Sequence, residues 1–448
     1  MNVIQYATNK YGEFIPYEVR PALYAGGVIT ARKEDVPAHE GFLGFGVAIT
    51  GSSCYNLNKM PPQERKEILE SIYGKKGLGL KVARLTIGSS DYSAELYTYD
   101  DVDGDMELNH FSIERDLEYI IPVIKEILTI CPELYLFASP WSPPGWMKTG
   151  GSVCGGYMRE KYVECYAEYF VKYLKAYAEQ GIHIKAITPQ NEPETQQEGL
   201  MPACIWHPDI EAKFIATLKK KLLENKLDTQ IWMYDHAFSG SDRVDWTLTE
   251  YEKLQYESDG IAFHYYSGNI EQTVYLKDKY PMLKLHFTEA GPRLFDHYDT
   301  DWCKWAIMMS KTINNRYSSF TGWNLMLDET GGPNIGKFFC GGLVTRNRFT
   351  NELSYSGQYK AFKHFTAFVN EESKIYPVHF EKSDERMHAF NDGRKPLTGS
   401  VVENKNGTSA LIMVNPNSNK AQIQFYHNNK WWYIELLPET VATICFEE

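Results

Sequence analysis

The sequence has no long hydrophobic segment and no extended basic segment. None of its apolar runs approaches the roughly 20 residues that a helix needs to span a bilayer, so we expect no transmembrane segment. No run of lysine or arginine exceeds Lys219–Lys221, and the formal net charge is −12. Nucleic acid and anionic membrane surfaces are therefore not expected as partners. The N-terminus has neither the basic nor the apolar part of a signal peptide, which predicts a cytoplasmic location.

Paired cysteines and cofactor motifs are also missing. The eight cysteines are scattered without a Cys-x-x-Cys pair, which favours buried thiols and disfavours a structural zinc site. No His-x-x-x-His motif indicates a metal centre, and the Gly44-x-Gly46 stretch lacks the third glycine of a dinucleotide-binding loop. We expect neither a metal nor another cofactor.

Aromatic residues, in contrast, are abundant. They make up 14% of the chain, with 31 Tyr, 22 Phe and 10 Trp. Much of this surplus is expected in the core, but Trp and Tyr also suit a site that stacks on the flat apolar faces of sugar rings. With 448 residues and 43% hydrophobic content, the chain can form one large domain and a smaller one.

Short strand-like runs alternate with helix-like segments from residue 44 to about residue 370. The eight apolar runs are 44–50, 82–87, 134–138, 182–187, 230–234, 260–265, 285–288 and 320–325, and the helical patterns include 113–128, 159–180, 209–225 and 300–316. This alternation predicts an α/β fold, a (β/α)8 TIM barrel with long loops after its strands. A doubly wound open sheet is the alternative, but its usual glycine-rich loop is absent.

The pattern changes to an alternation of apolar and polar residues after about Tyr376. Three such runs, at 410–414, 421–426 and 431–434, are separated by turn residues, which predicts a small antiparallel β-sandwich domain. The first 40 residues show no helical period, and we expect them to add one or two strands to that domain. The predicted domains are residues 1–40 joining the β-domain, 41–372 forming the barrel and 373–448 forming the β-domain.

A glutamate follows the fourth predicted strand in a rigid setting. Pro189 and Pro193 flank Gln190-Asn191-Glu192, and proline cannot donate to a strand ladder, so the strand ends there. A carboxylate fixed at a strand end points out of the sheet, where a catalytic acid is often placed. Taken alone, Glu192 could equally be a loop residue that caps a helix.

A second glutamate closes the seventh predicted strand in His286-Phe287-Thr288-Glu289. Because the carboxyl ends of barrel strands meet at one face, Glu289 is expected nearly opposite Glu192 across the mouth. Glycoside hydrolysis needs such a pair, one carboxyl to protonate the leaving oxygen and one to attack or to activate water. No Ser-His-Asp order fits the same strand ends.

Several further segments resemble one enzyme family. They are Arg84-Leu85-Thr86-Ile87-Gly88-Ser89-Ser90-Asp91-Tyr92-Ser93, Ser139-Pro140-Trp141-Ser142-Pro143-Pro144-Gly145-Trp146, Gln190-Asn191-Glu192-Pro193, Phe263-His264-Tyr265-Tyr266, Thr288-Glu289 and Gly322-Trp323-Asn324-Leu325. In this order they are similar to glycoside hydrolase family 30, in clan A, which includes acid β-glucosidases (glucosylceramidases). The resemblance extends over about residues 40 to 370.

The resemblance implies a role for each matched residue. Glu192 would be the general acid/base and Glu289 the nucleophile. The others would bind sugar or support the carboxylates: Asn191 at the 2-hydroxyl, Asp91 and Trp141 at other sugar hydroxyls, Trp323 stacking beside the sugar, Tyr266 and His264 contacting the carboxylates, and Arg84 beside the nucleophile. A cation at Arg84 would keep Glu289 ionised, and the charge of Glu289 would raise the pKa of Glu192.

The expected activity is that of a retaining hydrolase acting on β-linked sugars through a covalent glycosyl-enzyme. The expected substrate is a small β-glucoside or oligosaccharide. The alternatives within the family are a β-xylosidase, a β-fucosidase or a β-1,6-glucanase, and the alternative outside it is a catalytically silent carbohydrate-binding barrel. Tyr92 and His236 depart from the glucosylceramidase branch, which has phenylalanine and a second acidic residue at these positions, and these departures bear on the substrate rather than on the chemistry.

Overall fold

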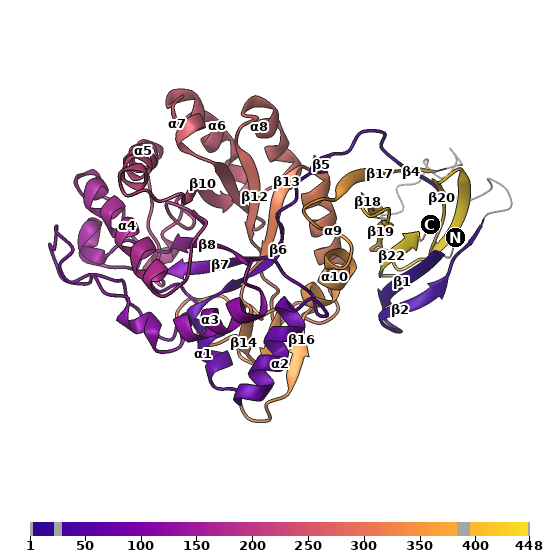
Figure 1. The fold of residues 1–448 in the computed structure, drawn as a ribbon, viewed down its shortest axis with the longest axis horizontal. Helices are drawn as coiled ribbons and strands as arrows, with labels where there is room; N and C mark the ends of the chain where they lie inside the picture. Colours follow the sequence, from indigo (N-terminus) through magenta and orange to yellow (C-terminus); the bar gives the residue numbers. More distant parts are fainter. Residues whose placement is uncertain (1–2, 22–28, 383–394, 447–448) are drawn as a thin grey trace. The chain divides into compact units, whose positions relative to one another are not determined.

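The structure, a computed structural model, describes residues 3–21, 29–382 and 395–446 (Figure 1). The chain divides into two compact units. One contains Met1–Gly44, His297–Ser318 and Tyr355–Glu448, and the other contains Phe45–Asp296 and Ser319–Ser354. No helix in the described ranges is both long and apolar enough to cross a membrane.

The eight predicted strands form a closed barrel, in the order β10-β11-β12-β13-β6-β7-β8-β9. Their bounds are β6 Gly44–Ile49, β7 Val82–Ile87, β8 Tyr135–Pro140, β9 Ala186–Ile187, β10 Gln230–Ala237, β11 Gly260–His264, β12 Lys284–Glu289 and β13 Tyr317–Gly322. The pairings of β6 with β7, β7 with β8 and β10 with β11 are parallel. The (β/α)8 prediction is confirmed.

The barrel strands are apolar on both faces because helices cover the outside and side chains fill the inside. Every residue of β6, β7 and β13 is buried. The helices between the strands are α1 Gly51–Asn58, α2 Pro62–Tyr73, α3 Ile120–Ile130, α4 Val163–Glu179, α5 Pro208–Glu224, α6 Ser241–Glu250, α7 Leu254–Glu257 and α8 Val274–Lys279. A small sheet follows β13, made of β14 Met326–Asp328, β15 Val344–Arg346 and β16 Leu353–Tyr355.

The helix expected over residues 113–128 begins later than predicted. Glu114–Leu117 form a 3-10 turn, and α3 starts only at Ile120. Pro122 explains the difference, because a proline ring clashes with the carbonyl four residues earlier and is tolerated only in the first turn of a helix. The apolar period alone did not reveal this boundary.

The other unit is built on a mainly antiparallel sheet. Its strands are β1 Val3–Asn9, β2 Gly12–Glu18, β3 Arg20–Pro21, β4 Ile29–Lys33, β5 His39–Glu40, β17 Lys374–Lys382, β18 Thr398–Glu403, β19 Ser409–Asn415, β20 Ala421–His427, β21 Lys430–Leu436 and β22 Thr440–Phe446. Among the pairings of these described strands, only that of β20 with β4 is parallel. β1 pairs antiparallel with β22, so the N-terminal segment does join the C-terminal strands, as predicted. Helices α9 Trp302–Asn314 and α10 Gly357–Thr366 belong to this unit.

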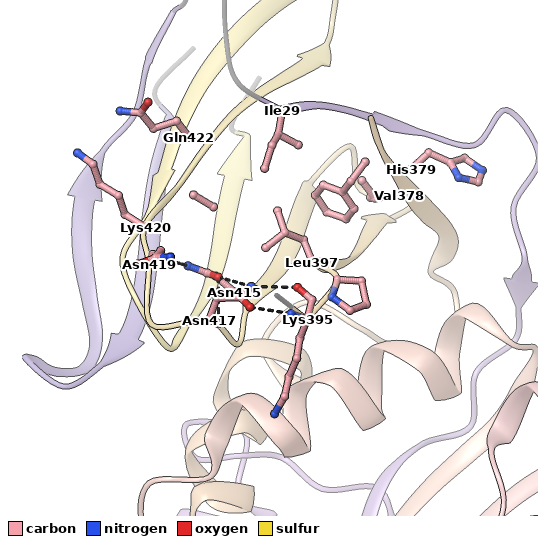
Figure 2. Close-up of a pocket in the computed structure, with 13 residues that line it drawn as sticks. Ile29, Val378, His379, Lys395, Leu397, Asn415, Asn417, Asn419, Lys420 and Gln422 are labelled. Carbon is pink, nitrogen blue, oxygen red and sulfur yellow. Dashed lines mark hydrogen bonds between the residues drawn. The ribbon is translucent and has the colours of Figure 1, made fainter. Parts of the chain in front are cut away.

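A hollow of about 660 Å³ lies among the strands of this β-domain (Figure 2). Ile29, Val378 and Leu397 contribute apolar lining, while Asn417 and Lys395 are joined by two hydrogen bonds at its edge, of 2.8 and 3.0 Å.

Candidate active site

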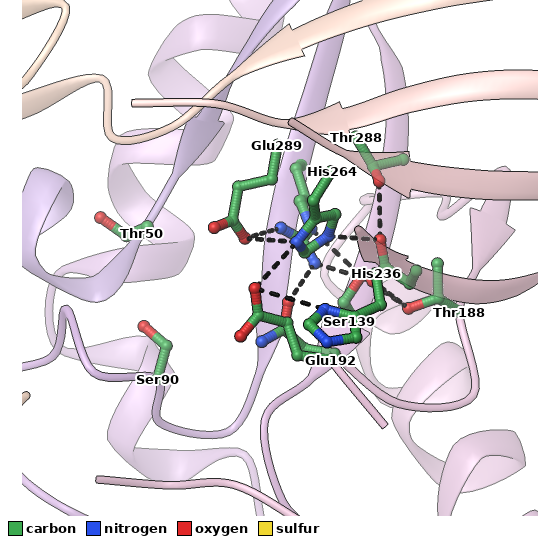
Figure 3. Close-up of polar contacts among 12 residues, drawn as sticks. Thr50, Ser90, Ser139, Thr188, Glu192, His236, His264, Thr288 and Glu289 are labelled. Carbon is green, nitrogen blue, oxygen red and sulfur yellow. Dashed lines mark hydrogen bonds and ion pairs between the residues drawn. The ribbon is translucent and has the colours of Figure 1, made fainter. Parts of the chain in front are cut away.

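The two glutamates meet at one end of the barrel. Glu289 is the last residue of β12, and Glu192 follows β9. Nδ1 of His264 lies 3.2 Å from Oε1 of Glu192 and 3.9 Å from Oε2 of Glu289, so one imidazole contacts both carboxylates. Figure 3 shows both carboxylates beside the ring of His264. The pair predicted from separate strand ends is therefore brought together.

Arg84 is the buried cation that organises the site. Its guanidinium, inside β7, has no exposed surface and donates hydrogen bonds to Glu289, to Asp235 Oδ2 at 2.7 Å and to Asn191 Oδ1 at 2.8 Å. Burial alone would lower the pKa of Arg84, but the charges of Asp235 and Glu289 outweigh it and raise that pKa. A permanently charged guanidinium thus lies against the carboxylate of Glu289.

Asp235 is a central residue that sequence reasoning did not single out. It is wholly buried in β10. Its two oxygens lie within hydrogen-bonding distance of five side chains: Arg84, Ser139, Thr188, His264 and Thr288. Burial would raise the pKa of Asp235, but Arg84 and then His264 lower it well below its usual range. An acidic residue near the end of the fifth barrel strand was the available signal.

His264 lies between Asp235 and Glu192 and contacts both carboxylates. Its Nε2 lies 3.0 Å from Oδ1 of Asp235, and its Nδ1 faces Glu192. Burial alone would lower the pKa of His264, but Glu289 and Asp235 raise it to about 9. The imidazole is therefore held in a fixed orientation and favours its protonated form.

The expected pKa shift of Glu192 is corrected by the structure. The sequence predicted that the charge of Glu289 would raise this pKa, and burial does act in that direction. The imidazoles of His236 and His264, both in polar contact with Glu192, outweigh burial and lower the pKa of Glu192 below its usual range. The sequence expectation counted only the charge of Glu289, although His264 was expected to contact the carboxylates; the structure adds His236 from β10 as a second imidazole beside Glu192.

Gln197 also contacts Glu192 and was missed. Its Nε2 donates a 2.8 Å hydrogen bond to Oε2 of Glu192. The loop reaches back because three non-glycine residues, Glu192, Gln197 and Glu198, have left-handed φ values of 51°, 49° and 56°. Such conformations are uncommon outside glycine and are costly, and they persist where the surrounding structure fixes them. No residue-type pattern predicts this turn.

The expected sugar-binding residues line a cavity of about 780 Å³ that opens at the two carboxylates. Asp91, Trp141, Asn191, Tyr266 and Trp323 all contribute to its wall. Asp91 is buried, and its Oδ1 has no hydrogen-bond partner within the described part of the chain. Burial, then the charges of Glu289 and Glu192, raise the pKa of Asp91 well above its usual range. A buried acceptor without a partner is costly, so a ligand hydroxyl would satisfy it.

The three aromatic residues expected at the site differ in how they face the cavity. Trp141 and Trp323 are each only 2% exposed and stack on one another with ring centroids 5.1 Å apart. Tyr266 is 45% exposed, and its hydroxyl donates a 2.8 Å hydrogen bond to Oε1 of Glu289. The tryptophans therefore form a closed wall, while Tyr266 presents its ring to the cavity and fixes the nucleophile candidate.

A second aromatic group lies at the outer rim of the cavity. Phe295 and Phe339 are 82% and 63% exposed, and their ring centroids are 6.0 Å apart. Lys337 and Glu198, also near the mouth, form a 2.5 Å ion pair between the loops that follow β14 and β9. An exposed apolar rim around a polar interior is typical of a ligand-binding surface.

Comparison with known proteins gives a consistent picture. The sequence model of the glycosyl hydrolase family 30 TIM-barrel domain matches residues 42–369. Putative glucosylceramidase 3 of Caenorhabditis elegans is 30% identical over 435 residues, which cover 91% of this chain and 80% of that protein. Endo-1,6-beta-D-glucanase of Neurospora crassa is 29% identical over 409 residues, covering 86% of this chain and 83% of its own.

Solved structures show the same fold over the full length. An endo-beta1,6-glucanase matches with a TM-score of 0.85 and 27% identity, covering 100% of both chains. The protein SrfJ of Salmonella typhimurium matches with a TM-score of 0.89 and full coverage, but at 23% identity its likeness concerns the fold alone.

Proposed function

Because this chain belongs to glycosyl hydrolase family 30 and is a glycoside hydrolase, we propose that it cleaves β-linked glucose with retention of configuration. Glu289 is the nucleophile in this proposal and Glu192 the general acid/base. The reaction proceeds in two displacements through a covalent glycosyl-enzyme.

The separation of the two carboxylates is the observation that carries this proposal. Nδ1 of His264 lies within 3.2 Å of Glu192 and 3.9 Å of Glu289, so the nearest oxygens of the two groups are at most about 7 Å apart. This upper bound is compatible with the roughly 5–5.5 Å spacing at which a carboxylate attacks directly in retaining enzymes. The hydrogen bonds that Arg84 and Tyr266 donate to Glu289 further support attack by that carboxylate.

In the first displacement, a Glu289 oxygen bonds to the anomeric carbon while the bond to the leaving oxygen breaks. Arg84 and Tyr266 each donate a hydrogen bond to Glu289, which fixes the direction of its lone pairs. Glu192 delivers a proton to the leaving oxygen. In this proposal Glu192 receives that proton from protonated His264, whose Nδ1 lies 3.2 Å from Oε1 of Glu192, as negative charge develops on the leaving group.

In the second displacement, water enters where the leaving group stood. Glu192 removes its proton, the water oxygen bonds to the anomeric carbon and the bond to Glu289 breaks. The sugar held in place meanwhile donates a hydroxyl to the unpartnered Oδ1 of Asp91 and contacts Asn191, whose side chain Arg84 already orients.

Glucose is proposed as the sugar because both groups of relatives carry it in the names of their activities, glucosylceramidase and endo-1,6-beta-D-glucanase. A β-1,6-glucan chain is the second candidate substrate. It is favoured by the endo-beta1,6-glucanase structure that covers all of both chains, and by the exposed Phe295 and Phe339, on which further glucose rings could stack.

A panel of substrates tests the proposal. Purified protein is incubated with nitrophenyl β-glucoside, β-xyloside and β-fucoside and with β-1,6-linked glucose oligosaccharides. We expect cleavage of the glucose compounds. Cleavage of only the xyloside or the fucoside would contradict the choice of sugar, and silence on every substrate would favour a carbohydrate-binding barrel without catalysis.

Azide separates the two carboxylate roles. Glu192→Ala should regain activity on an activated glucoside when azide is added, and the product should be the β-glycosyl azide. Glu289→Gly should be inactive without azide, and it should form the α-glycosyl azide when azide is added. An exchange of these two outcomes would reverse the proposed assignment.

A further inference from the structure

Three potential metal ligands converge at the proposed acid/base. Glu192, His236 and His264 each offer one donor atom, and these atoms lie within 4.8 Å of one another. Across residues 3–21, 29–382 and 395–446, no other trio of His, Cys, Asp or Glu side chains has this arrangement. The three residues come from β10, β11 and the loop after β9, which end at the same face of the barrel.

The distances suit a small tetrahedral ion. Oε1 of Glu192 lies 3.2 Å from Nδ1 of His264 and 3.6 Å from Nδ1 of His236. Zinc bonds of about 2.0–2.2 Å in a tetrahedron place neighbouring ligand atoms roughly 3.4 Å apart. Two histidines and one carboxylate are also a ligand set that zinc uses in proteins, with a fourth position left open.

The surroundings already orient two of the ligands. Nε2 of His264 is bonded to Asp235 at 3.0 Å, which leaves Nδ1 directed at Glu192. A carboxylate on the far nitrogen of a ligating histidine is the usual support of a zinc site. Gln197 occupies Oε2 of Glu192, so Oε1 is the oxygen left for an ion.

His236 adds an independent indication. Its Nδ1 is buried and makes no hydrogen bond, with Glu192 as its near neighbour at 3.6 Å. Buried polar atoms nearly always have a hydrogen-bond partner, so a ring nitrogen without one, beside a carboxylate and a second imidazole, needs an explanation. A bound cation would satisfy it. The side chain is 17% exposed and lines the cavity, which gives an ion access from solvent.

We propose that Glu192, His236 and His264 bind Zn²⁺ and that bound zinc switches hydrolysis off. The ion would occupy the place between Oε1 of Glu192 and Nδ1 of His264 and fill its fourth position with water from the cavity. Glu192 could then neither deliver nor accept a proton. Zinc binding does not depend on the proposed function, whereas the inhibition rests on it.

Binding is tested by calorimetric titration of zinc chloride into chelator-treated, dialysed protein. We expect one zinc per chain in the unaltered protein and a loss of affinity of about 10-fold or more in His236→Ala. Glu192→Gln, which keeps the shape and removes the charge, should bind as weakly. Thermal melts without metal establish that each variant is folded.

His207 provides the matched control. It is an exposed histidine whose Nδ1 lies 3.1 Å from Oδ2 of Asp209, so it offers zinc a surface imidazole and carboxylate. His207→Ala should leave affinity and stoichiometry unchanged. Cobalt should also give the visible absorption of a tetrahedral site in the unaltered protein and in His207→Ala, and not in His236→Ala.

The outcomes separate the two proposals. Equal zinc affinity in His236→Ala and the unaltered protein, or loss of binding in His207→Ala alone, would overturn the metal site. Zinc binding with the expected ligand dependence but without hydrolysis of any glycoside would leave the site standing and refute the proposed function. Hydrolysis that persists when zinc saturates the protein would refute the inhibition.

Discussion

The two oxygens of Glu192 are held by different groups, and this decides how the carboxyl can react. Oε2 accepts a hydrogen bond from the neutral amide of Gln197, while Oε1 faces His264 and His236. Proton exchange is therefore confined to Oε1. Gln197 acts as a positioning residue, since it keeps the carboxyl plane fixed while the proton moves on the other oxygen.

Replacing Gln197 by alanine should slow hydrolysis of glucosides with poor leaving groups by roughly 10-fold or more. A hydrogen bond to a charged acceptor contributes about 1.5–3 kcal/mol, and about 1.4 kcal/mol corresponds to a tenfold change in rate. Glucosides with activated leaving groups need little acid assistance and should be affected less in that step. The measurement is kcat/KM on both kinds of substrate. Gln196→Ala, at the exposed neighbouring position, is the control and should leave both values unchanged.

Asp91 should be important for holding the sugar. Its unpartnered Oδ1 lies in the wall of the cavity, so Asp91→Ala removes an acceptor that only a ligand satisfies. We expect kcat/KM to fall roughly 10- to 100-fold, because losing one partner of a buried hydrogen bond costs about 1–3 kcal/mol. Asp103→Ala, at an exposed position, is the comparison. Equal activity of the two variants would show that Asp91 does not contact substrate.

Among the residues of the site, the sequence predicted those that lie at the ends of barrel strands, Glu192 and Glu289 above all. It did not predict Gln197, because its approach depends on left-handed backbone angles rather than on a residue pattern. Nor did it predict the direction of the Glu192 pKa shift. That direction is set by His236 and His264, which lower the pKa although burial raises it.

The loop after β8 is held by a buried ammonium group. Nζ of Lys148 donates to the carbonyls of Val153, Gly155 and Ala203 at 2.8, 2.8 and 2.9 Å. Burial lowers the pKa of Lys148 to about 8. Lys148→Met keeps the apolar stem but leaves the three carbonyls without this donor.

We expect Lys148→Met to lower the free energy of unfolding by about 3 kcal/mol, since each unsatisfied buried acceptor costs about 1–3 kcal/mol and part of the loop will relax. Chemical denaturation measures the change. Lys185→Met, at an exposed position, should stay within about 0.5 kcal/mol of the unaltered protein. A similar effect of both substitutions would contradict the role of Lys148.

Helix α10 carries a histidine, His364, that makes the stability of the β-domain depend on pH. His364 is buried, with Nδ1 3.0 Å from Thr443 on β22 and Nε2 2.8 Å from Thr8 on β1. Burial lowers the pKa of His364 to about 3. An unfolded histidine has a pKa of about 6.5, so below that pH the unfolded chain binds a proton that the folded chain excludes.

His364 should therefore contribute no pH dependence above about pH 6.5 and a loss of stability as pH falls from about 6.5 towards about 3. The full effect of one proton is about 1.4 kcal/mol per pH unit. Comparing denaturation of the unaltered protein and His364→Asn between pH 4 and 7 isolates this contribution. The variant should show the shallower slope, whereas His183→Asn, at an exposed position, should keep the original one. Identical slopes in all three proteins would exclude the effect.

The elements themselves were predictable to different degrees. The barrel strands were found because parallel strands buried on both faces read as short apolar runs. β17, β18 and β22 were not identified, since much of β18 and β22 is buried without clear alternation. The late start of α3 at Ile120 was set by Pro122, a local steric constraint that the 3.6-residue period did not contain.

At the scale of the whole molecule, chain order and spatial order diverge. The sheet unit gathers Met1–Gly44, His297–Ser318 and Tyr355–Glu448, so it includes helices that follow the seventh and eighth barrel strands. The sequence predicted that β1 would join the C-terminal strands, because the first residues lacked any other apolar surface to pack on. It could not assign α9 and α10 to that unit, since their apolar faces resemble those of any barrel helix.

The central claim is that Glu289 attacks the anomeric carbon, and the configuration of the first-formed product tests it most directly. Hydrolysis of a β-glucoside is followed by proton NMR from the first minutes, before the two anomers of the free sugar equilibrate. Two displacements at the same carbon predict that β-glucose appears first and the α-anomer later. Initial release of α-glucose would mean a single displacement by water, and would contradict the covalent intermediate on Glu289.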